Sequence, residues 1–99
     1  MVIYLNGQNQ ILKLEELFKG TLSTSAVYPR EVVKRALDNN AAAIVLVHNH
    51  PSGNSTPSKD DLAITKKLKE ATQSIDVSVH DHLIIAGNDV YSFADHGIL

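Results

Sequence analysis

Apolar residues along this chain fall into short runs separated by polar stretches, and each run predicts one element of secondary structure. The run Val2–Leu5 has the length of a strand, and the pair Asn6-Gly7 that follows it is a strong turn signal. Residues 10–14 can then return as the second strand of a hairpin. Thr21-Leu22 is a candidate for a further short strand, so we expect the chain to open with β-structure.

A helical period replaces this pattern in the next segment. Pro29 suits the first turn of a helix, because its missing N–H and fixed φ are tolerated there. Apolar positions at helical spacing give this helix one hydrophobic face: Val32, Val33, Ala36 and Leu37. We expect the helix to end at Asn39-Asn40. The unbroken apolar run 41–47 then predicts a strand that is buried on both faces.

The second half of the chain repeats the order of helix and strand. Residues 48–57 form a polar loop with proline and glycine, and a second helix is expected over about 58–73. The apolar stripe of that helix consists of Leu62, Thr65 and Leu68. Residues 77–86 and 90–93 are predicted to be closing strands that turn near Gly87-Asn88. Strands that alternate with two helices predict an α/β sandwich around one mixed sheet.

Composition narrows the class of protein. The 99 residues suit a single domain spanning 1–99, and an apolar share of 43% is enough for a core. A formal net charge of -2 argues against unaided binding to nucleic acid. The absence of cysteine excludes disulfides and thiol chemistry and fits a cytoplasmic protein. The run 41–47 is far too short to span a membrane.

So small a domain has a limited hydrophobic core, and therefore a bound metal or a partner chain can matter to its stability. The exposed edges of a small sheet also make a homodimer possible.

Candidate chemistry is concentrated just after the buried strand. His48 and His50 are two residues apart, a spacing at which extended backbone points both side chains the same way. Asp61 follows a Pro/Gly-containing loop and falls in the first turn of the second helix. Two imidazoles and one carboxylate form a ligand set that leaves the fourth zinc position open. Zinc in such a site activates water at neutral pH and polarises a carbonyl, which suits hydrolysis.

Structural interpretations compete with this one. Ser58 and Asp61 match a capping box, which would explain both residues without a metal. Asp81 and His82 are expected to make structural hydrogen bonds beside the sheet, in preference to a second metal site with His80. Zinc deaminase chemistry is excluded because it needs cysteine ligands.

Other polar residues near these segments have expected structural roles. Gly53 permits a tight turn, and Asn49 and Ser52 hold the loop through side-chain-to-backbone hydrogen bonds. Glu31 supplies a favourable negative charge at the start of the first helix. His96, near the end of the sequence, is expected to be solvated.

The spacing of the candidate ligands resembles the JAMM motif of MPN-domain metalloproteases. In that motif two histidines flank one residue, and a serine and an aspartate follow at the separations that Ser58 and Asp61 have here. Over essentially the whole chain, the sequence is similar to the bacterial RadC branch of this family. The segments that carry this similarity are Leu17-Phe18-Lys19-Gly20-Thr21-Leu22, Pro29-Arg30-Glu31-Val32, His48-Asn49-His50-Pro51-Ser52-Gly53, Asp81-His82-Leu83-Ile84-Ile85 and Tyr91-Ser92-Phe93-Ala94.

The resemblance implies an MPN (JAMM) fold, a curved mixed β-sheet between helices in cytidine-deaminase-like α-β-α layers. It implies one zinc ion per chain on His48, His50 and Asp61, and Ser58 as a hydrogen-bond donor to the oxyanion of a tetrahedral intermediate. The implied activity is hydrolysis of a peptide or isopeptide bond in a peptide or protein substrate. The alternative is a catalytically weak or inactive MPN interaction module. RadC proteins have also been labelled DNA repair proteins, a role that the charge balance of this chain does not support.

One feature departs from the family pattern. JAMM enzymes use a glutamate as general base, and the resemblance places it a few residues before the first strand, here Val2–Leu5. None of the glutamates at hand, Glu15, Glu16 and Glu31 among them, matches that position. We also expect the helical region that precedes this domain in RadC proteins to be absent. A missing general base would lower turnover without preventing zinc binding.

Overall fold

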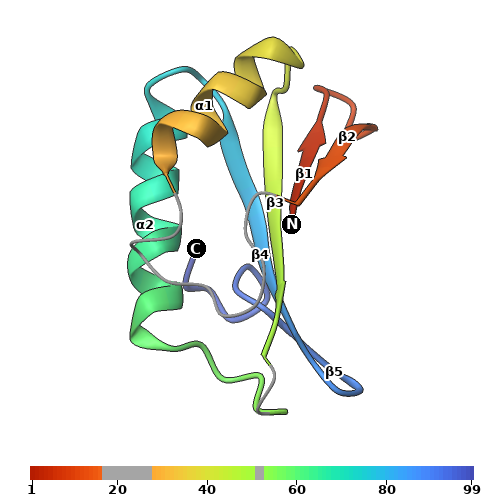
Figure 1. Ribbon diagram of the computed structural model, residues 1–99, viewed down its shortest axis with the longest axis vertical. Coiled ribbons are helices and arrows are strands. Elements are labelled where there is room, and N and C mark those ends of the chain that lie inside the picture. The colour runs from red at the N-terminus through yellow and green to blue at the C-terminus, as the bar shows by residue number, and fades with distance from the viewer. Residues whose placement is uncertain (17–27, 51–52) are drawn as a thin grey trace.

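The computed structural model describes residues 1–16, 28–50 and 53–99. Within these ranges the chain forms five strands and two helices (Figure 1): β1 (Val2–Leu5), β2 (Ile11–Glu15), α1 (Pro29–Asp38), β3 (Ala43–Asn49), α2 (Lys59–Gln73), β4 (Ser78–Ala86) and β5 (Asp89–Ser92). The strand predicted at Thr21-Leu22 and the loop position Ser52 lie outside the described residues.

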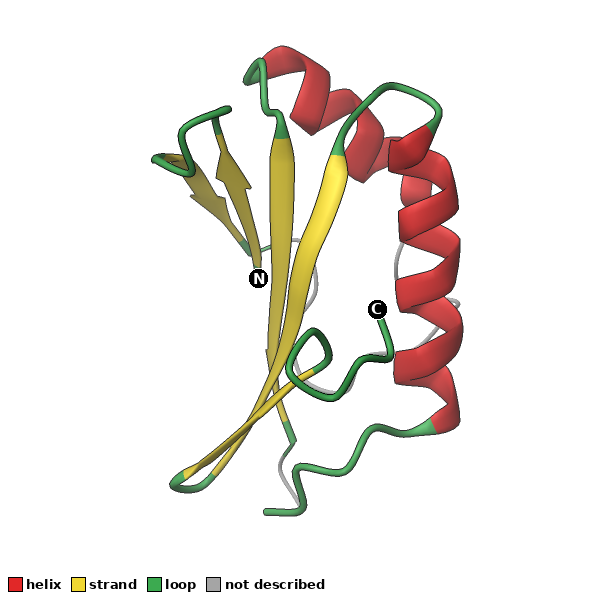
Figure 2. Ribbon diagram, turned by 180° about the vertical axis from the view of Figure 1, so that it is seen from behind, coloured by secondary structure: helices red, strands yellow, loops and turns green. Residues whose placement is uncertain are grey.

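The strands form one mixed sheet in the order β2-β1-β3-β4-β5. β1 pairs antiparallel with β2 and with β3, β4 pairs antiparallel with β5, and β3 pairs parallel with β4. A parallel pair needs a crossover connection, and α2 supplies it. Figure 2 shows α2 alongside the β3–β4 pair. The mixed α/β sheet expected from the sequence is therefore confirmed.

The hairpin at the start of the chain is held by Asn6. Its Oδ1 accepts hydrogen bonds from the backbone N–H groups of Gln8 and Gln10, both at 2.9 Å. The backbone N–H of Asn6 also donates to the carbonyl of Gln10 at 3.0 Å. Asn9 takes a φ of 60°, a left-handed conformation that asparagine tolerates. The turn predicted at Asn6-Gly7 is present, and side-chain hydrogen bonds close it.

Both described helices pack on the same face of the sheet. Val32 and Ala36 of α1 belong to one buried cluster with Ile64 and Leu68 of α2. The residues of β1 and β3 in that cluster alternate along each strand: Val2, Tyr4, Ile44 and Leu46. Both described helices thus form one layer on this sheet face, and the mixed α/β arrangement is consistent with the MPN (JAMM) fold that the resemblance implied.

β3 extends further than the apolar run predicted. The sequence placed the strand at 41–47 and put His48 and Asn49 in the following loop. In the structure His48 pairs with Ile84 of β4 and Asn49 pairs with Ile85. The pairing of β3 with β4 continues through the polar residues His48 and Asn49. The end of the apolar run therefore does not mark the end of the strand. His48 is consequently held in the sheet.

An irregularity in β4 decides which of its side chains face the helices. Ile44 pairs with Val79, but the next residue of β3, Val45, pairs with Asp81, so His80 is an extra residue on β4. Such a β-bulge re-aims the residues that follow it. Val79 and His82 are therefore both buried although they are three positions apart in the sequence, and His82 has an exposed fraction of 0%. Without the bulge, Asp81 would face the core instead.

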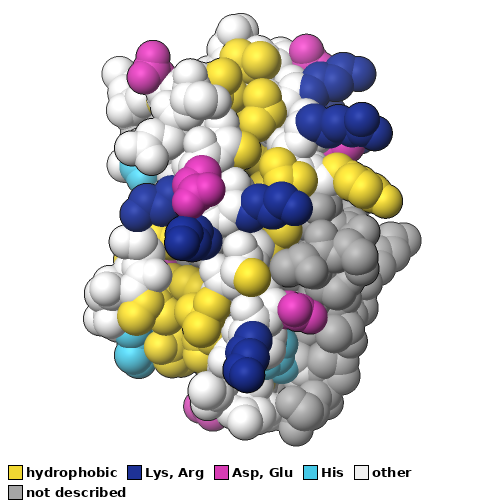
Figure 3. Space-filling view, turned by 90° about the vertical axis from the view of Figure 1, so that its left-hand side faces the viewer, with side chains coloured by type: hydrophobic (Ala, Val, Ile, Leu, Met, Phe, Trp, Pro, Cys, Tyr) yellow, Lys and Arg dark blue, Asp and Glu magenta, His cyan; other side chains and the backbone are white. Residues whose placement is uncertain are grey.

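The distribution of charged side chains on the surface is consistent with the small net charge of the chain. On the face that α2 presents, basic side chains are separated by acidic and apolar ones and form no continuous basic surface (Figure 3). Lys66, Lys67 and Lys69 of α2 are exposed. Neither described helix combines the length and hydrophobicity that a membrane span requires.

Candidate metal centre

The three predicted ligands converge where the end of β3 meets the start of α2. His48 lies in the last part of β3, His50 follows the strand, and Asp61 lies in the first turn of α2. His48 Nε2 is 3.0 Å from Asp61 Oδ1, and His50 Nε2 is 2.9 Å from Asp61 Oδ2. One candidate ligand atom from each residue lies within 4.8 Å of the others. The structure therefore brings together a group that can hold a metal ion.

The capping interpretation of Asp61 is confirmed as well. The backbone N–H of Ser58 donates to Asp61 Oδ2 at 2.7 Å, and the backbone N–H of Asp61 donates to Ser58 Oγ at 3.0 Å. These two hydrogen bonds form a capping box at the start of α2. The cap holds the Asp61 side chain, with an exposed fraction of 1%, in place against the two histidines. The structural and metal-binding roles are thus compatible.

The loop after β3 fixes the ring of His50. His50 Nδ1 lies 2.7 Å from the carbonyl oxygen of Asn54. Because a carbonyl can only accept, Nδ1 carries the hydrogen, and in the neutral ring Nε2 is left with a lone pair that faces Asp61. Gly53, at a φ of +78°, donates its N–H to the His50 carbonyl at 3.1 Å. The tight turn predicted at Gly53 therefore shapes the loop that orients a candidate ligand.

The ring of His48 shows the clearest sign of a cation site. Its Nε2 is buried, and among the described residues no group forms a hydrogen bond with it, although Asp61 Oδ1 is 3.0 Å away. A buried polar atom without a partner is costly in a folded protein. A metal ion between His48, His50 and Asp61 would satisfy this nitrogen and neutralise the facing carboxylate. The residues present therefore fit a divalent metal.

The protonation states also suit a metal. Burial lowers the pKa of His48 and outweighs the opposite effect of the Asp61 carboxylate, so this imidazole is neutral near pH 7. Burial acts to raise the pKa of Asp61, but contacts from Ser58 and the two histidines outweigh it, and the pKa is lowered overall. A neutral imidazole and an ionised carboxylate are the forms that bind metal.

His82 belongs to the candidate centre, although the sequence analysis gave this residue only a structural role. Its Nε2 lies 2.8 Å from His48 Nδ1, on the side of the His48 ring away from Asp61. Asp81 holds the backbone beside it, accepting hydrogen bonds from the backbone N–H groups of His82 and Ala94 at 2.7 and 3.0 Å. The predicted structural hydrogen bonds are confirmed, and His82 touches a candidate ligand. The Asp81-His82 pair was the only indication of this in the sequence.

The remaining histidines lie outside this group. His80 is exposed and its Nε2 is 3.0 Å from Asn9 Oδ1, so it does not share a site with the buried His82. His96 is exposed, as predicted, and stacks on Tyr91 with ring centroids 3.9 Å apart. Glu31 lies in the first turn of α1, as expected.

Access to the centre is one-sided. The side chains of His48 and Asp61 are 2% and 1% exposed, whereas that of His50 is 16% exposed. Ser58 is also exposed. Among the described residues, the exposed side of the centre is therefore formed by His50 and Ser58, while the side chains of His48 and Asp61 are buried.

The burial of His82 has a measurable consequence for the metal-free protein. Burial, the largest cause, lowers its pKa to about 3. In an unfolded chain that pKa is about 6.5. Between these values the unfolded state binds a proton that the folded state does not, so the free energy of unfolding decreases as the pH falls. We expect a loss of about 2 kcal/mol between pH 6.5 and pH 5 from this group alone.

Urea unfolding in the presence of a chelator, at several pH values from 7 to 5, measures this loss. In a His82→Phe variant the titrating group is gone, so the pH dependence should become shallower. An equally steep dependence in both proteins would show that His82 is not its source.

The fold and the centre together define a class: an α/β domain of the JAB type, in which a strand end and the next helix present a His-His-Asp group. The chain matches the family model described as the RadC-like JAB domain over residues 1–98 and belongs to that family. This result confirms the resemblance inferred from the JAMM spacing.

Curated relatives support the same assignment. The chain is 57% identical over 99 residues to the UPF0758 protein YfjY of Escherichia coli (strain K12), covering 100% of this chain and 62% of that protein. It is 58% identical over 98 residues to YeeS of the same organism, covering 99% of this chain and 66% of YeeS. A UPF0758 protein of Dechloromonas aromatica is 57% identical over 100 residues, and the match covers 100% of this chain but 44% of that protein. The chain thus spans less than half of the length of one of these relatives and about two thirds of the length of the other two.

Proposed function

We propose that this domain is a zinc-dependent hydrolase of the JAMM type that cleaves a peptide or isopeptide bond. The observation that carries the proposal is the orientation of the three ligand residues. The Nε2 atoms of His48 and His50 both face the carboxylate of Asp61, at 3.0 and 2.9 Å, with one of these nitrogens buried and lacking a hydrogen bond. A purely structural cap needs Ser58 and Asp61 only, and it does not explain the two facing imidazoles.

Zinc is the metal that this donor set favours. Two imidazole nitrogens and one carboxylate are typical of catalytic zinc sites, which keep a further position for water or substrate. Calcium and magnesium prefer sites built from oxygen alone. When bound, zinc supplies activation of a water molecule and polarisation of the scissile carbonyl.

Ser58 lies where it can assist such a reaction. Its Oγ accepts the Asp61 N–H at the helix cap, which leaves its own hydroxyl hydrogen available to donate. Ser58 is exposed beside the open side of the centre. In the proposed reaction this hydroxyl donates a hydrogen bond to the oxygen of the substrate carbonyl as negative charge develops there.

A general base is the part of the proposal that the described residues do not supply. The metal-binding group found among them contains no glutamate. The JAMM resemblance places this base before the first strand. We therefore propose that full turnover requires a glutamate presented to the centre from a segment ahead of β1.

The experiment compares two proteins: the 99-residue chain, and the same chain preceded by a segment that carries a glutamate. Both are loaded with zinc and incubated with a peptide library and with isopeptide-linked substrates. We expect about one zinc per chain in both and cleavage that is faster by about 100-fold or more in the longer protein. A version of the longer protein with that glutamate changed to glutamine is the control and should lose the gain.

Two results would contradict the proposal. Zinc content well below one ion per chain, with no gain on adding zinc, would remove the metal centre. Full zinc loading without cleavage by either protein would leave a metal-containing interaction module instead of a hydrolase.

A further inference from the structure

A continuous line of hydrogen bonds runs behind the metal centre and joins two of its ligand residues. It starts at His48 Nδ1, which lies 2.8 Å from His82 Nε2. The other ring nitrogen of His82, Nδ1, lies 2.5 Å from Thr65 Oγ1. The hydroxyl of Thr65 in turn donates to the backbone carbonyl of Asp61 at 2.7 Å. The line begins at His48 and ends at Asp61, which lies one helical turn before Thr65 in α2.

The chemistry of these groups gives the line one direction when a metal is bound. A metal on His48 Nε2 leaves the ring hydrogen on Nδ1, which must then donate to His82 Nε2. His82 Nε2 therefore carries no hydrogen, and His82 Nδ1 donates to Thr65 Oγ1. The Thr65 hydroxyl donates its hydrogen bond to the backbone carbonyl oxygen of Asp61, which can only accept. Every hydrogen in the line has an acceptor in this arrangement.

The reverse direction opposes metal binding. If His82 Nε2 carried the hydrogen, His48 Nδ1 would have to accept it. The hydrogen of the neutral His48 ring would then be on Nε2, where it blocks the lone pair that a metal needs. His82 Nδ1 would then have to accept the hydroxyl hydrogen of Thr65. The hydrogen bond from Thr65 to the Asp61 carbonyl would be lost.

We propose that His82 and Thr65 act as a positioning pair that holds His48 in its metal-binding tautomer. This inference rests on the proposed metal centre and assigns two residues that do not themselves touch the metal. Thr65 sets the tautomer of His82 by offering it an acceptor, and His82 in turn sets the tautomer of His48.

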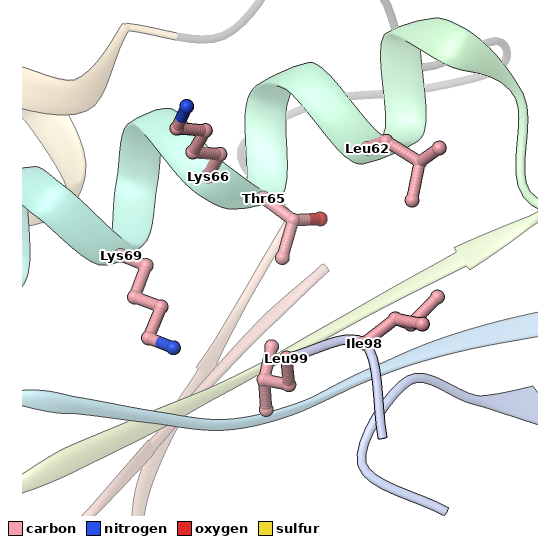
Figure 4. A pocket seen from close by; sticks show the side chains of 6 residues that line it. All are labelled: Leu62, Thr65, Lys66, Lys69, Ile98 and Leu99. Carbon is pink, nitrogen blue, oxygen red and sulfur yellow. The ribbon is translucent and has the colours of Figure 1, made fainter. Parts of the chain in front are cut away.

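The fold holds this pair firmly. The His82 ring stacks on Phe93, with centroids 4.4 Å apart and planes 23° apart, and both side chains are 0% exposed. The bulge at His80 turns His82 toward α2, because it shifts the pairing of β4 by one residue. Thr65 is 4% exposed, and Figure 4 shows its side chain on the side of α2 that faces the strands and the C-terminal residues. Burial keeps water from replacing either partner.

Substitution of Thr65 by valine tests the pair without touching a ligand or an imidazole. The variant keeps the shape of the side chain but removes the acceptor for His82 Nδ1–H. His82 then favours the opposite tautomer, which places the hydrogen of His48 on the metal-binding nitrogen. We expect zinc affinity, measured by competition with a chelator of known affinity, to fall by about 10- to 100-fold. Thr65→Ser keeps the hydroxyl and should restore most of the affinity.

Thr72 provides a matched control on the same helix. It is 0% exposed, and its hydroxyl donates to the carbonyl of Leu68 at 2.9 Å, four residues earlier, as the hydroxyl of Thr65 does to Asp61. Thr72→Val therefore removes an equivalent buried hydroxyl far along α2, and we expect its zinc affinity to equal that of the parent. A loss of zinc affinity in Thr65→Val alone separates positioning from a general weakening of the helix.

Imidazole nitrogen NMR of the zinc-loaded parent gives an independent readout. We expect the hydrogen of His82 on Nδ1 and that of His48 on Nδ1. The inference is overturned if His82 carries its hydrogen on Nε2, or if folded Thr65→Val binds zinc as tightly as the parent. Should Thr65→Val fail to fold, the NMR result alone decides. A parent protein that binds no zinc would instead overturn the proposed function, so the two failures are distinguishable.

Discussion

Replacing Asp61 with alanine is expected to abolish stable zinc binding and the stabilisation that zinc provides. The variant removes the only carboxylate in the candidate metal-binding group found among the described residues and leaves His48 and His50 as a pair. Changes beyond the direct ligands already lower metal affinity by about 10- to 100-fold, so loss of a ligand should exceed about 100-fold. Zinc at a thousand times its dissociation constant stabilises the parent by about 4 kcal/mol.

The measurement is the melting temperature with saturating zinc and with chelator. For a domain of this size, that stabilisation raises the parent melting temperature by roughly 15 °C or more, whereas a variant that binds zinc about 100-fold more weakly should gain at most about a third of that rise at the same zinc concentration. Asp60→Ala is the matched control, because Asp60 is an exposed acidic residue in the same first turn of α2. Asp60→Ala should keep the full zinc-dependent gain. An equal gain in Asp61→Ala would contradict the assignment of this ligand.

Substitution of Ser58 has the second large expected effect, and it separates catalysis from metal binding. Ser58→Ala removes the hydroxyl that we assign to the substrate carbonyl oxygen, and loss of one such donor typically lowers kcat by about 100- to 1,000-fold. Zinc content should stay at one ion per chain, because Ser58 is not part of the metal-binding group. The helix cap is lost as well, at a cost of about 1 kcal/mol of stability.

Ser58→Gly and Ser58→Thr distinguish the two roles of this residue. Glycine at the N-cap costs only about a few tenths of a kcal/mol, so Ser58→Gly removes the hydroxyl with little loss of stability. Threonine keeps both the cap and the hydroxyl. We expect hydrolysis to be low in the alanine and glycine variants and near the parent rate in Ser58→Thr. If Ser58→Gly hydrolyses substrate at the parent rate, Ser58 serves the helix alone.

Local patterns were sufficient to predict which three residues converge in the candidate metal centre. The separation of His48 and His50 places both rings on one side of extended backbone, and Ser58 with Asp61 marks the first turn of the next helix. The structure confirms both features because each depends on neighbouring residues. The end of α2 at Gln73 also agrees with the helix range of about 58–73 expected from the sequence.

Features that depend on pairing between distant segments could not be predicted in the same way. The continuation of β3 through His48 and Asn49 depends on its register with β4. The burial of His82 depends on the bulge at His80, which no local pattern of β4 required. The contact between His82 and His48 joins residues 34 positions apart. Sequence reasoning therefore recognised His82 as a hydrogen-bonding residue beside the sheet and near the metal loop, but it did not identify the contact with His48.

Anomalous diffraction at the zinc absorption edge, on crystals of the zinc-loaded protein, tests the central claim most directly. The account predicts one strong peak per chain, bounded by His48 Nε2, His50 Nε2 and the Asp61 carboxylate, with zinc–nitrogen distances of about 2.0–2.1 Å. Crystals of Asp61→Ala grown in the same way should lack that peak. Zinc bound only elsewhere, for example at the exposed His80 or His96, or no peak at saturating zinc, would contradict the account.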